Sequence, residues 1–282
     1  MKLWALSDFH LNHRANREAL AAIGHYPDDW LLVPGDVSER LDDIDFAWRT
    51  LNERFKVVIW TPGNHELWTT HDGDEIQRGV EKYDRIVDLC RDHGVLTPED
   101  PYPVFSESGQ SVVIAPLFLL YDYSFRPDDV RDDEVIAWAA KGGVRCSDES
   151  MLAPDPYASR IDWCRARVEA TIPRLESSAA NNETILVNHW PLRQDTIWIP
   201  RIPRFTPWCG TRRTEDWHLR FRAQAVVSGH LHVRSTRWID GVRFEEVSLG
   251  YPKHWKAERG IDHYLRQILP APPPRRIPRF YR

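Results

Sequence analysis

The sequence predicts an α/β fold, and three observations support that prediction. Short runs rich in branched apolar residues alternate with amphipathic stretches of helical length. Five of the apolar runs stop at Gly, Asn, Asp or His, as buried strands do where polar loops follow them. Later in the chain, two further runs flank Asp240-Gly241, a pair typical of hairpin turns. Helices alternating with strands, followed by a hairpin, indicate two facing sheets with helices outside them.

The predicted elements follow one another along the chain in a regular order. The five expected strands are residues 2–7, 30–33, 56–61, 184–187 and 225–228. The expected helices are residues 14–23, 41–55, 76–93 and 162–175, the last interrupted near its end by Pro173. The hairpin pairs residues 233–239 with residues 242–247. Since ligands of open α/β sheets bind at the carboxyl ends of strands, we expect the functional site there.

Two stretches interrupt this alternation of helices and strands. Residues 121–157 are polar and contain Gly142-Gly143 together with prolines, and residues 190–217 combine Pro, Arg and Trp. We interpret both as insertions over one face of a single domain that spans residues 1–269. Residues 270–282 then form a basic tail rich in proline and arginine.

Composition narrows the class of protein. Of the 282 residues, 42% are hydrophobic and 28% are charged, which is typical of globular chains. No apolar run approaches the roughly 20 residues of a membrane-spanning helix, and the first residues lack the apolar stretch of a signal peptide. We therefore expect a cytoplasmic protein without a membrane partner. The formal net charge of -5 argues against a broad nucleic-acid surface, and four widely spaced cysteines indicate reduced thiols.

Groups suited to metal binding follow all five predicted strands. They are Asp8, His10, Asp36, Asn64, His65, His189, His230 and His232. Imidazole nitrogens mixed with oxygen donors suit divalent Mn, Fe or Zn, and the lack of thiolates argues against a structural zinc site. These groups exceed the needs of one ion. A carboxylate can bridge two ions with its two oxygens, and Asp36 is our candidate for that bridge.

The order of these motifs resembles that of a known family. D-x-H from position 8, G-D from 35, G-N-H-E from 63, a lone H at 189 and G-H-x-H from 229 are arranged as in calcineurin-like metallophosphoesterases. The resemblance implies a four-layer α-β-β-α sandwich of two mixed sheets and a site for two metal ions. Turn chemistry alone also places Asp and Asn at strand ends, but it does not explain five motifs in this order.

The same resemblance implies a role for each site residue. One ion would be held by Asp8, His10, Asp36 and His232, and the other by Asp36, Asn64, His189 and His230. His65 would contact the phosphate and protonate the leaving oxygen without binding either ion. Many members orient that histidine with an Asp a few residues after the G-D motif, and in this chain Glu39 occupies that place.

Four segments carry a closer resemblance, to actinobacterial 4′-phosphopantetheinyl hydrolases, which remove the prosthetic group of acyl carrier proteins. They are residues 60–70, 118–125, 208–211 and 241–248. This resemblance implies a phosphodiester substrate and an acyl carrier protein as partner. The insertions would wall the pocket with Trp and Arg, offering apolar contact to a pantetheine arm and positive charge to a phosphate. The expected substrate contacts are Asn64, Arg193, Arg212 and Arg213.

The sequence as a whole predicts a phosphoesterase that uses two metal ions to hydrolyse a phosphodiester. Hydroxide formed on the ions would attack phosphorus while His65 assists the leaving alcohol. One alternative is a phosphodiesterase of nucleotides or single-stranded nucleic acid, with the Trp and Arg insertion stacking bases and neutralising phosphates. Another is a protein-binding scaffold that has lost catalysis, which is disfavoured because every expected ligand position is filled.

Overall fold

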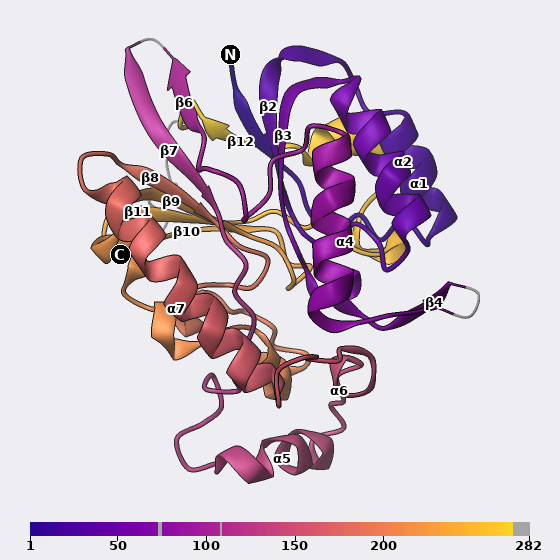
Figure 1. The fold of residues 1–282 in the computed structure, drawn as a ribbon, viewed down its shortest axis with the longest axis vertical. Coiled ribbons are helices and arrows are strands. Elements are labelled where there is room, and N and C mark those ends of the chain that lie inside the picture. Colours follow the sequence, from indigo (N-terminus) through magenta and orange to yellow (C-terminus); the bar gives the residue numbers. More distant parts are fainter. Residues whose placement is uncertain (73–74, 108, 273–282) are drawn as a thin grey trace, which may run out of the picture.

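The computed structural model describes residues 1–72, 75–107 and 109–272 of the chain. Two mixed sheets of four and six strands lie face to face, as predicted, with helices over their outer sides (Figure 1). The four-stranded sheet has the order β12-β1-β2-β3, formed by Arg266–Leu269, Leu3–Ala5, Tyr26–Pro34 and Phe55–Thr61. In this sheet β1, β2 and β3 are parallel, and β12 runs antiparallel beside β1.

The six-stranded sheet has the order β10-β11-β9-β8-β7-β6. Its strands are Ser235–Ile239, Val242–Glu246, Ala223–Ser228, Thr184–Val187, Gln110–Pro116 and Val104–Glu107. The predicted hairpin is confirmed, because β10 and β11 pair antiparallel around Asp240-Gly241. Strands β6, β7 and β12 are absent from the sequence prediction. Two of these, β6 and β12, are four-residue strands at the edges of the sheets, where the apolar pattern is weakest.

Burial on both faces explains why the predicted strands lack a polar alternation. Alternate residues such as Ala5, Leu32 and Ile59 pack with Ile185 and Val227 of the other sheet. Their neighbours in sequence face the helices and belong to the second apolar cluster. The period of two in a strand therefore divides each apolar run between the inter-sheet core and the outer layers.

The main helices cover the outer faces of the two sheets (Figure 1). They are α1 (Arg14–Ala21), α2 (Leu41–Asn52) and α4 (Gly79–Asp92) beside the four-stranded sheet, and α7 (Arg160–Ala179) beside the other. The remaining helices are short: α3 (Asn64–Leu67), α5 (Val135–Lys141), α6 (Asp148–Met151) and α8 (Trp217–Arg220). Helices α5 and α6 lie in the first predicted insertion, and the second consists mainly of loops and 3₁₀ turns. No helix in these described ranges is long and apolar enough to cross a bilayer.

Several predicted helix boundaries are wrong. Helix α1 ends at Ala21 rather than at residue 23, and α2 ends at Asn52 rather than at residue 55, because β3 begins at Phe55. Helix α4 starts at Gly79 rather than at residue 76, because β5 (Glu75–Gln77) pairs with β4 (Thr70–Asp72). Gly79 has a positive φ of 59°, and a Cβ there would lie 2.4 Å from the carbonyl oxygen of Asp155. Helix α7 starts at Arg160 and continues through the exposed Pro173 to Ala179, beyond the predicted range of residues 162–175.

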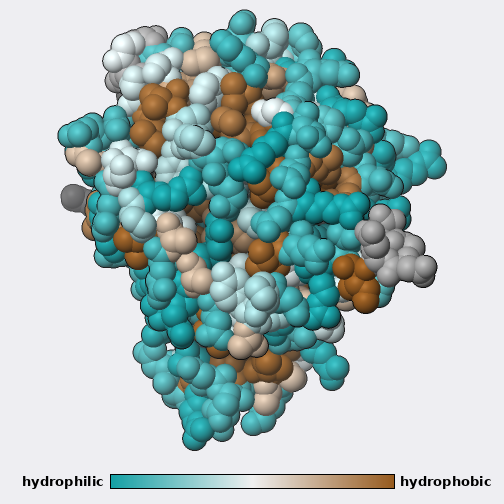
Figure 2. Space-filling model, viewed as in Figure 1, coloured by the Kyte–Doolittle hydropathy of each residue, from teal (hydrophilic) through white to brown (hydrophobic). Residues whose placement is uncertain are grey.

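The face shown in Figure 2 is mostly hydrophilic, and its hydrophobic residues form small separate patches. Such scattered apolar residues are ordinary on a protein surface. Most of the predicted basic tail, residues 273–282, lies outside the described residues.

The start of α7 generates a stability prediction. Ser159 is its N-cap, and the Oγ atom accepts a hydrogen bond from the backbone N–H of Asp162 at 3.1 Å. Ser159→Ala should lower the free energy of unfolding by about 1 kcal/mol in urea denaturation, because that donor loses its partner. Ser177→Ala, an exposed change in the same helix, is the control and should leave the midpoint nearly unchanged. Equal effects of both changes would contradict the cap.

Candidate metal centre

Loops at the carboxyl ends of five strands bring the predicted ligands together. Asp8 and His10 follow β1, Asp36 follows β2, Asn64 and His65 begin α3 after β3, His189 follows β8, and His230 and His232 follow β9. All of these except His232 are buried, and the His232 side chain is 13% exposed. Ligand atoms of Asp8, His10, Asp36 and His232 all lie within 4.8 Å of one another. The tertiary structure therefore makes one cluster out of five separate motifs.

The backbone at this cluster adopts a conformation that side chains rarely accept. Asp8, His10, Asp36, His230 and His232 all have positive φ angles, between 43° and 73°. They are five of the eight non-glycine residues with positive φ in the described ranges. Each such residue costs on the order of 1–3 kcal/mol, and this strain persists where the surroundings hold it for function. The turns hold these side chains toward a common centre.

Asp36 lies between two groups of histidines. Its Oδ1 is 3.5 Å from His189 Nε2 and accepts the backbone N–H of His65 at 3.0 Å. Its Oδ2 is 3.8 Å from His10 Nε2. Burial, with Asp8 and Glu66 nearby, raises the pKa of Asp36 well above its usual value. Two oxygens facing different histidines fit the bridging role expected of Asp36, and a dication would offset the repulsion between the carboxylates.

The imidazoles face one another as metal ligands do. His10 Nε2 lies 3.0 Å from His232 Nε2, and His189 Nε2 lies 3.2 Å from His230 Nδ1. Burial lowers the pKa of His189 to about 4, and it lowers the pKa values of His10 and His230 well below the usual range. These rings are therefore neutral near pH 7, the form that binds metals. The buried His230 Nε2 has no hydrogen-bond partner within the described residues.

Asn64 adds an oxygen donor to the second group of histidines. Its Oδ1 lies 3.1 Å from His189 Nε2, on the side of the cluster where His230 also lies. Nearby, Gly63 leaves the space that Asp36 occupies, since a Cβ at Gly63 would lie 2.2 Å from Asp36 Oδ1. Imidazoles, carboxylates and an amide oxygen at these distances are suitable ligands for two divalent ions such as Mn, Fe or Zn.

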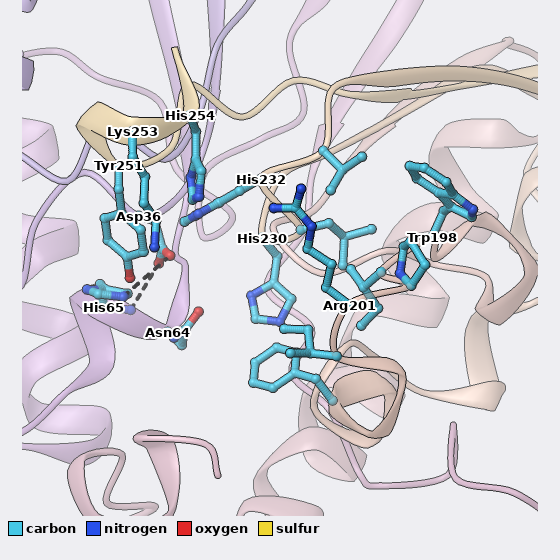
Figure 3. A pocket seen from close by; sticks show the side chains of 16 residues that line it. Asp36, Asn64, His65, Trp198, Arg201, His230, His232, Tyr251, Lys253 and His254 are labelled. Carbon is cyan, nitrogen blue, oxygen red and sulfur yellow. Dashed lines mark hydrogen bonds and ion pairs between the residues drawn. The ribbon is translucent and has the colours of Figure 1, made fainter. Parts of the chain in front are cut away.

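His65 lies beside the cluster and faces the cavity (Figure 3). Its Nε2 is 3.9 Å from Asp36 Oδ2, and its Nδ1 is 3.8 Å from Glu39 Oε2. Burial opposes ionisation of Glu39, but the neighbouring His65 and Lys82 lower its pKa below the usual value. Glu39 is therefore an anion next to His65 and beyond direct hydrogen-bond distance. Its expected orienting role stays a prediction.

Two residues of this centre, Glu66 and Asp148, had no role in the sequence prediction. Glu66 belongs to the G-N-H-E motif, and its buried carboxylate accepts the backbone N–H groups of Asp36, Val37 and Gly63 at 2.8–2.9 Å. Its place three residues into the turn that starts α3 is a capping position, which could have identified it. No local signal marks Asp148, which reaches the centre from α6.

A cavity of about 710 Å³ opens from the metal centre. Asp36, Asn64, His65, His230 and His232 line its inner part, and three further residues beside them are Tyr251, Lys253 and His254. The opposite wall comes from the second insertion and is largely apolar (Figure 3). Its residues are Trp198, Ile199, Pro200, Arg201, Ile202 and Phe205. Trp198 is 57% exposed and Ile202 is 46% exposed, which places apolar surface at the mouth.

The structure does not bring the three predicted substrate-binding arginines to this cavity. Arg193 bonds to Asp195, Arg212 bonds to Asp128 at 2.7 Å, and Arg213 faces Asp122 at 3.7 Å. These guanidinium groups are paired with carboxylates, and none of the three lines the cavity. The cationic side chains that line the cavity are Arg201 and Lys253, and no carboxylate among the described residues pairs with either.

Comparison with known proteins gives three findings. A family model described as calcineurin-like phosphoesterase matches residues 1–234. The chain is 47% identical over 272 residues to the [acyl-carrier-protein] phosphodiesterase PptH of Mycobacterium tuberculosis, covering 96% of this chain and 84% of that one. The crystal structure of phosphopantetheinyl hydrolase (PptH) from Mycobacterium tuberculosis matches with a TM-score of 0.89 and 46% identity, over 96% of both chains.

The position of Asp36 generates a metal-binding prediction. Asp36→Asn should weaken the binding of both ions, because an amide cannot bridge with two anionic oxygens. His232→Ala should weaken the binding of mainly one ion. Elemental analysis of Mn-loaded protein after gel filtration measures the ions retained per chain. Asp128→Asn, an exposed change, is the control and should retain the wild-type content. One ion per wild-type chain would contradict the two-ion site.

Proposed function

The chain belongs to the calcineurin-like phosphoesterase family. We propose that it releases 4′-phosphopantetheine from a holo-acyl carrier protein by hydrolysing the phosphodiester. The observation that carries the proposal is the joint position of the metal centre and a cavity with one apolar wall. A relative of 47% identity is named for this activity. With the phosphate of the substrate at the metal centre, the cavity could hold the uncharged pantetheine arm. The carrier protein could then bind at the mouth of the cavity.

The proposed ligand sets follow from the two groups around Asp36. Asp8, His10, Asp36 and His232 would hold one ion, and Asp36, Asn64, His189 and His230 the other. When bound, the two ions supply Lewis-acid activation of water and neutralise charge on the phosphate. The donor set suits Mn, Fe or Zn. The chain itself keeps the imidazoles neutral by burial and holds them at fixed turns.

His65 would supply the proton that the leaving serine oxygen needs. Its ring borders the cavity beside Asp36, and Trp68 packs against it with ring centroids 3.7 Å apart. The Glu39 carboxylate lies 3.8 Å from Nδ1 on the other side of the ring. The Trp68 contact limits rotation of the ring. His65 is thus a general acid held in place by its neighbours.

The rest of the substrate would use the cavity walls. The apolar side chains of Trp198, Ile202 and Phe205 offer contact to a pantetheine arm, and Arg201 and Lys253 offer unpaired positive charge to the phosphate or an acidic protein surface. We therefore assign substrate contact to these two cations in place of the paired arginines. The nucleic-acid alternative loses support because three tryptophans of the second insertion, Trp190, Trp208 and Trp217, are buried and cannot stack on bases. Three of the insertion's arginines are also paired with carboxylates.

One comparison of substrates tests the proposed function directly. Mn-loaded protein should release phosphopantetheine from holo-acyl carrier protein and act weakly on cyclic nucleotides and single-stranded DNA. Mass spectrometry of the carrier protein and chromatography of the nucleotides measure the three reactions side by side. Hydrolysis of nucleotides without release from carrier protein would overturn the proposal and favour the nucleotide alternative.

Replacement of His65 tests the general acid. His65→Ala should lower turnover of carrier protein by about 10²–10⁴-fold while the chain keeps its ions. The loss should shrink for a p-nitrophenyl phosphodiester, because p-nitrophenolate leaves without a proton. Kinetics with both substrates and metal analysis of the same sample are the measurements. Loss of metal in this variant would show that His65 is a ligand.

Replacement of the two cations at the cavity tests substrate contact. Arg201→Ala and Lys253→Ala should each raise KM for holo-acyl carrier protein by about tenfold, or about 1.4 kcal/mol of binding free energy. Lys56→Ala is the matched control, because Lys56 is exposed at the opposite, amino end of β3. Steady-state kinetics measure the effect. An unchanged KM in both variants would place the carrier protein elsewhere.

A further inference from the structure

Helix α6 of the first insertion reaches the metal centre through one buried carboxylate. Asp148 is fully buried. Its Oδ1 accepts hydrogen bonds from Asn64 Nδ2 at 3.1 Å and from Trp68 Nε1 at 2.7 Å. Its Oδ2 forms no hydrogen bond of normal geometry among the described residues, and the buried Tyr121 hydroxyl is the neighbouring group that favours the carboxylate. Burying a carboxylate costs free energy, so its presence here needs a reason.

The contact with Asn64 decides which end of the amide faces the histidines. Only the carbonyl oxygen of an amide can bind a cation, because the NH₂ group is a donor. With Nδ2 bonded to Asp148, Oδ1 faces His189 Nε2 at 3.1 Å. Rotation by a half turn would direct Nδ2 at that histidine and at the proposed ion. It would also bring Asn64 Oδ1 against the Asp148 carboxylate, which repels it.

Asp148 is itself held firmly enough to act in this way. The backbone N–H of Thr69 donates to the carbonyl of Met151 at 2.6 Å, and Trp68 forms a β-bridge with Leu152. Arg160 donates to the backbone carbonyls of Asp148 and Leu152 at 3.1 and 3.0 Å. These contacts join α6 to the loop that follows His65 on one side and to the start of α7 on the other. The carboxylate position is therefore set by the backbone on both sides.

We propose that Asp148 is a positioning residue, which fixes the amide of Asn64 so that Oδ1 faces the ion shared with His189 and His230. This inference rests on the proposed place of Asn64 in that ligand set. It gives the first insertion a part in assembling the metal centre, beyond covering the cavity. Asp148 does so without contacting the ion or the substrate.

The test compares metal binding by two variants at this position. Asp148→Ala removes the acceptor, and it should bind one of the two Mn ions at least tenfold more weakly than wild type. Asp148→Asn retains an Oδ1 acceptor at the same place, and its affinity for both ions should stay within threefold of wild type. Calorimetric Mn titration and elemental analysis measure binding without reference to activity. Should Asp148→Ala fail to fold, Asp148→Leu keeps the volume without the acceptor and replaces it.

Matched controls separate orientation of Asn64 from general loosening. Trp68→Phe removes the other donor to Oδ1 and keeps an aromatic ring beside His65, so both ions should stay bound. Glu149→Gln changes the next residue of α6, which bonds to Tyr123, Trp208 and Arg160, and should also retain them. Loss of an ion in Trp68→Phe or Glu149→Gln equal to that in Asp148→Ala would overturn the inference.

The remaining outcomes distinguish this inference from the ligand set beneath it. Asn64→Ala should lose the same ion as Asp148→Ala. If Asn64→Ala keeps both ions at wild-type affinity, the proposed ligand set is wrong and the inference falls with it. If Asn64→Ala loses an ion while Asp148→Ala does not, the ligand set stands and only the role of Asp148 is overturned.

Discussion

The metal centre depends on the backbone hydrogen bonds that the buried carboxylate of Glu66 accepts. It accepts the backbone N–H groups of Gly63, Asp36 and Val37, and so joins the loop after β3 to the loop after β2. One loop carries the central carboxylate, and the other carries Asn64 and His65. Burial raises the pKa of Glu66, while the three backbone donors oppose that rise. Without this carboxylate, three buried donors would lose their partner, at a cost of about 1–3 kcal/mol each.

The metal centre also buries several charged and polar groups, which costs free energy. Two aspartates, several imidazoles and an amide are packed where little water enters, and five of these residues have strained backbones. Neutral imidazoles reduce the charge that must be buried, because their pKa values are lowered. Lys82 adds a buried cation nearby, whose pKa burial lowers to about 8, and it donates to the Glu39 and Trp68 carbonyls. Strain and desolvation of this size are typical of a site built in advance for cations.

The two insertions contribute to different parts of the site. The second forms the apolar wall of the cavity with Trp198 and Phe205, while the first supplies α6 and its buried carboxylate. Trp208 of the second insertion donates to Glu149 of α6, so the two insertions contact each other. Selection of a substrate and assembly of the metal centre thus share one set of contacts outside the two sheets. This arrangement connects the apolar wall of the cavity to Asn64, the proposed ligand, through Glu149 and Asp148 of α6.

The features that depend on local order could be predicted from the sequence. Apolar runs ending at Asp8, Asp36, Asn64, His189 and His230 predict parallel strands, and the carboxyl ends of such strands meet at one edge. Residue types at those ends also determine the donor chemistry. Three features could not be predicted without the fold: which arginines reach the cavity, where α4 begins, and the contact of Asp148 with Asn64 across 84 positions of sequence. Such contacts depend on how loops pack over the sheets, and loop packing leaves no periodic signal in the chain.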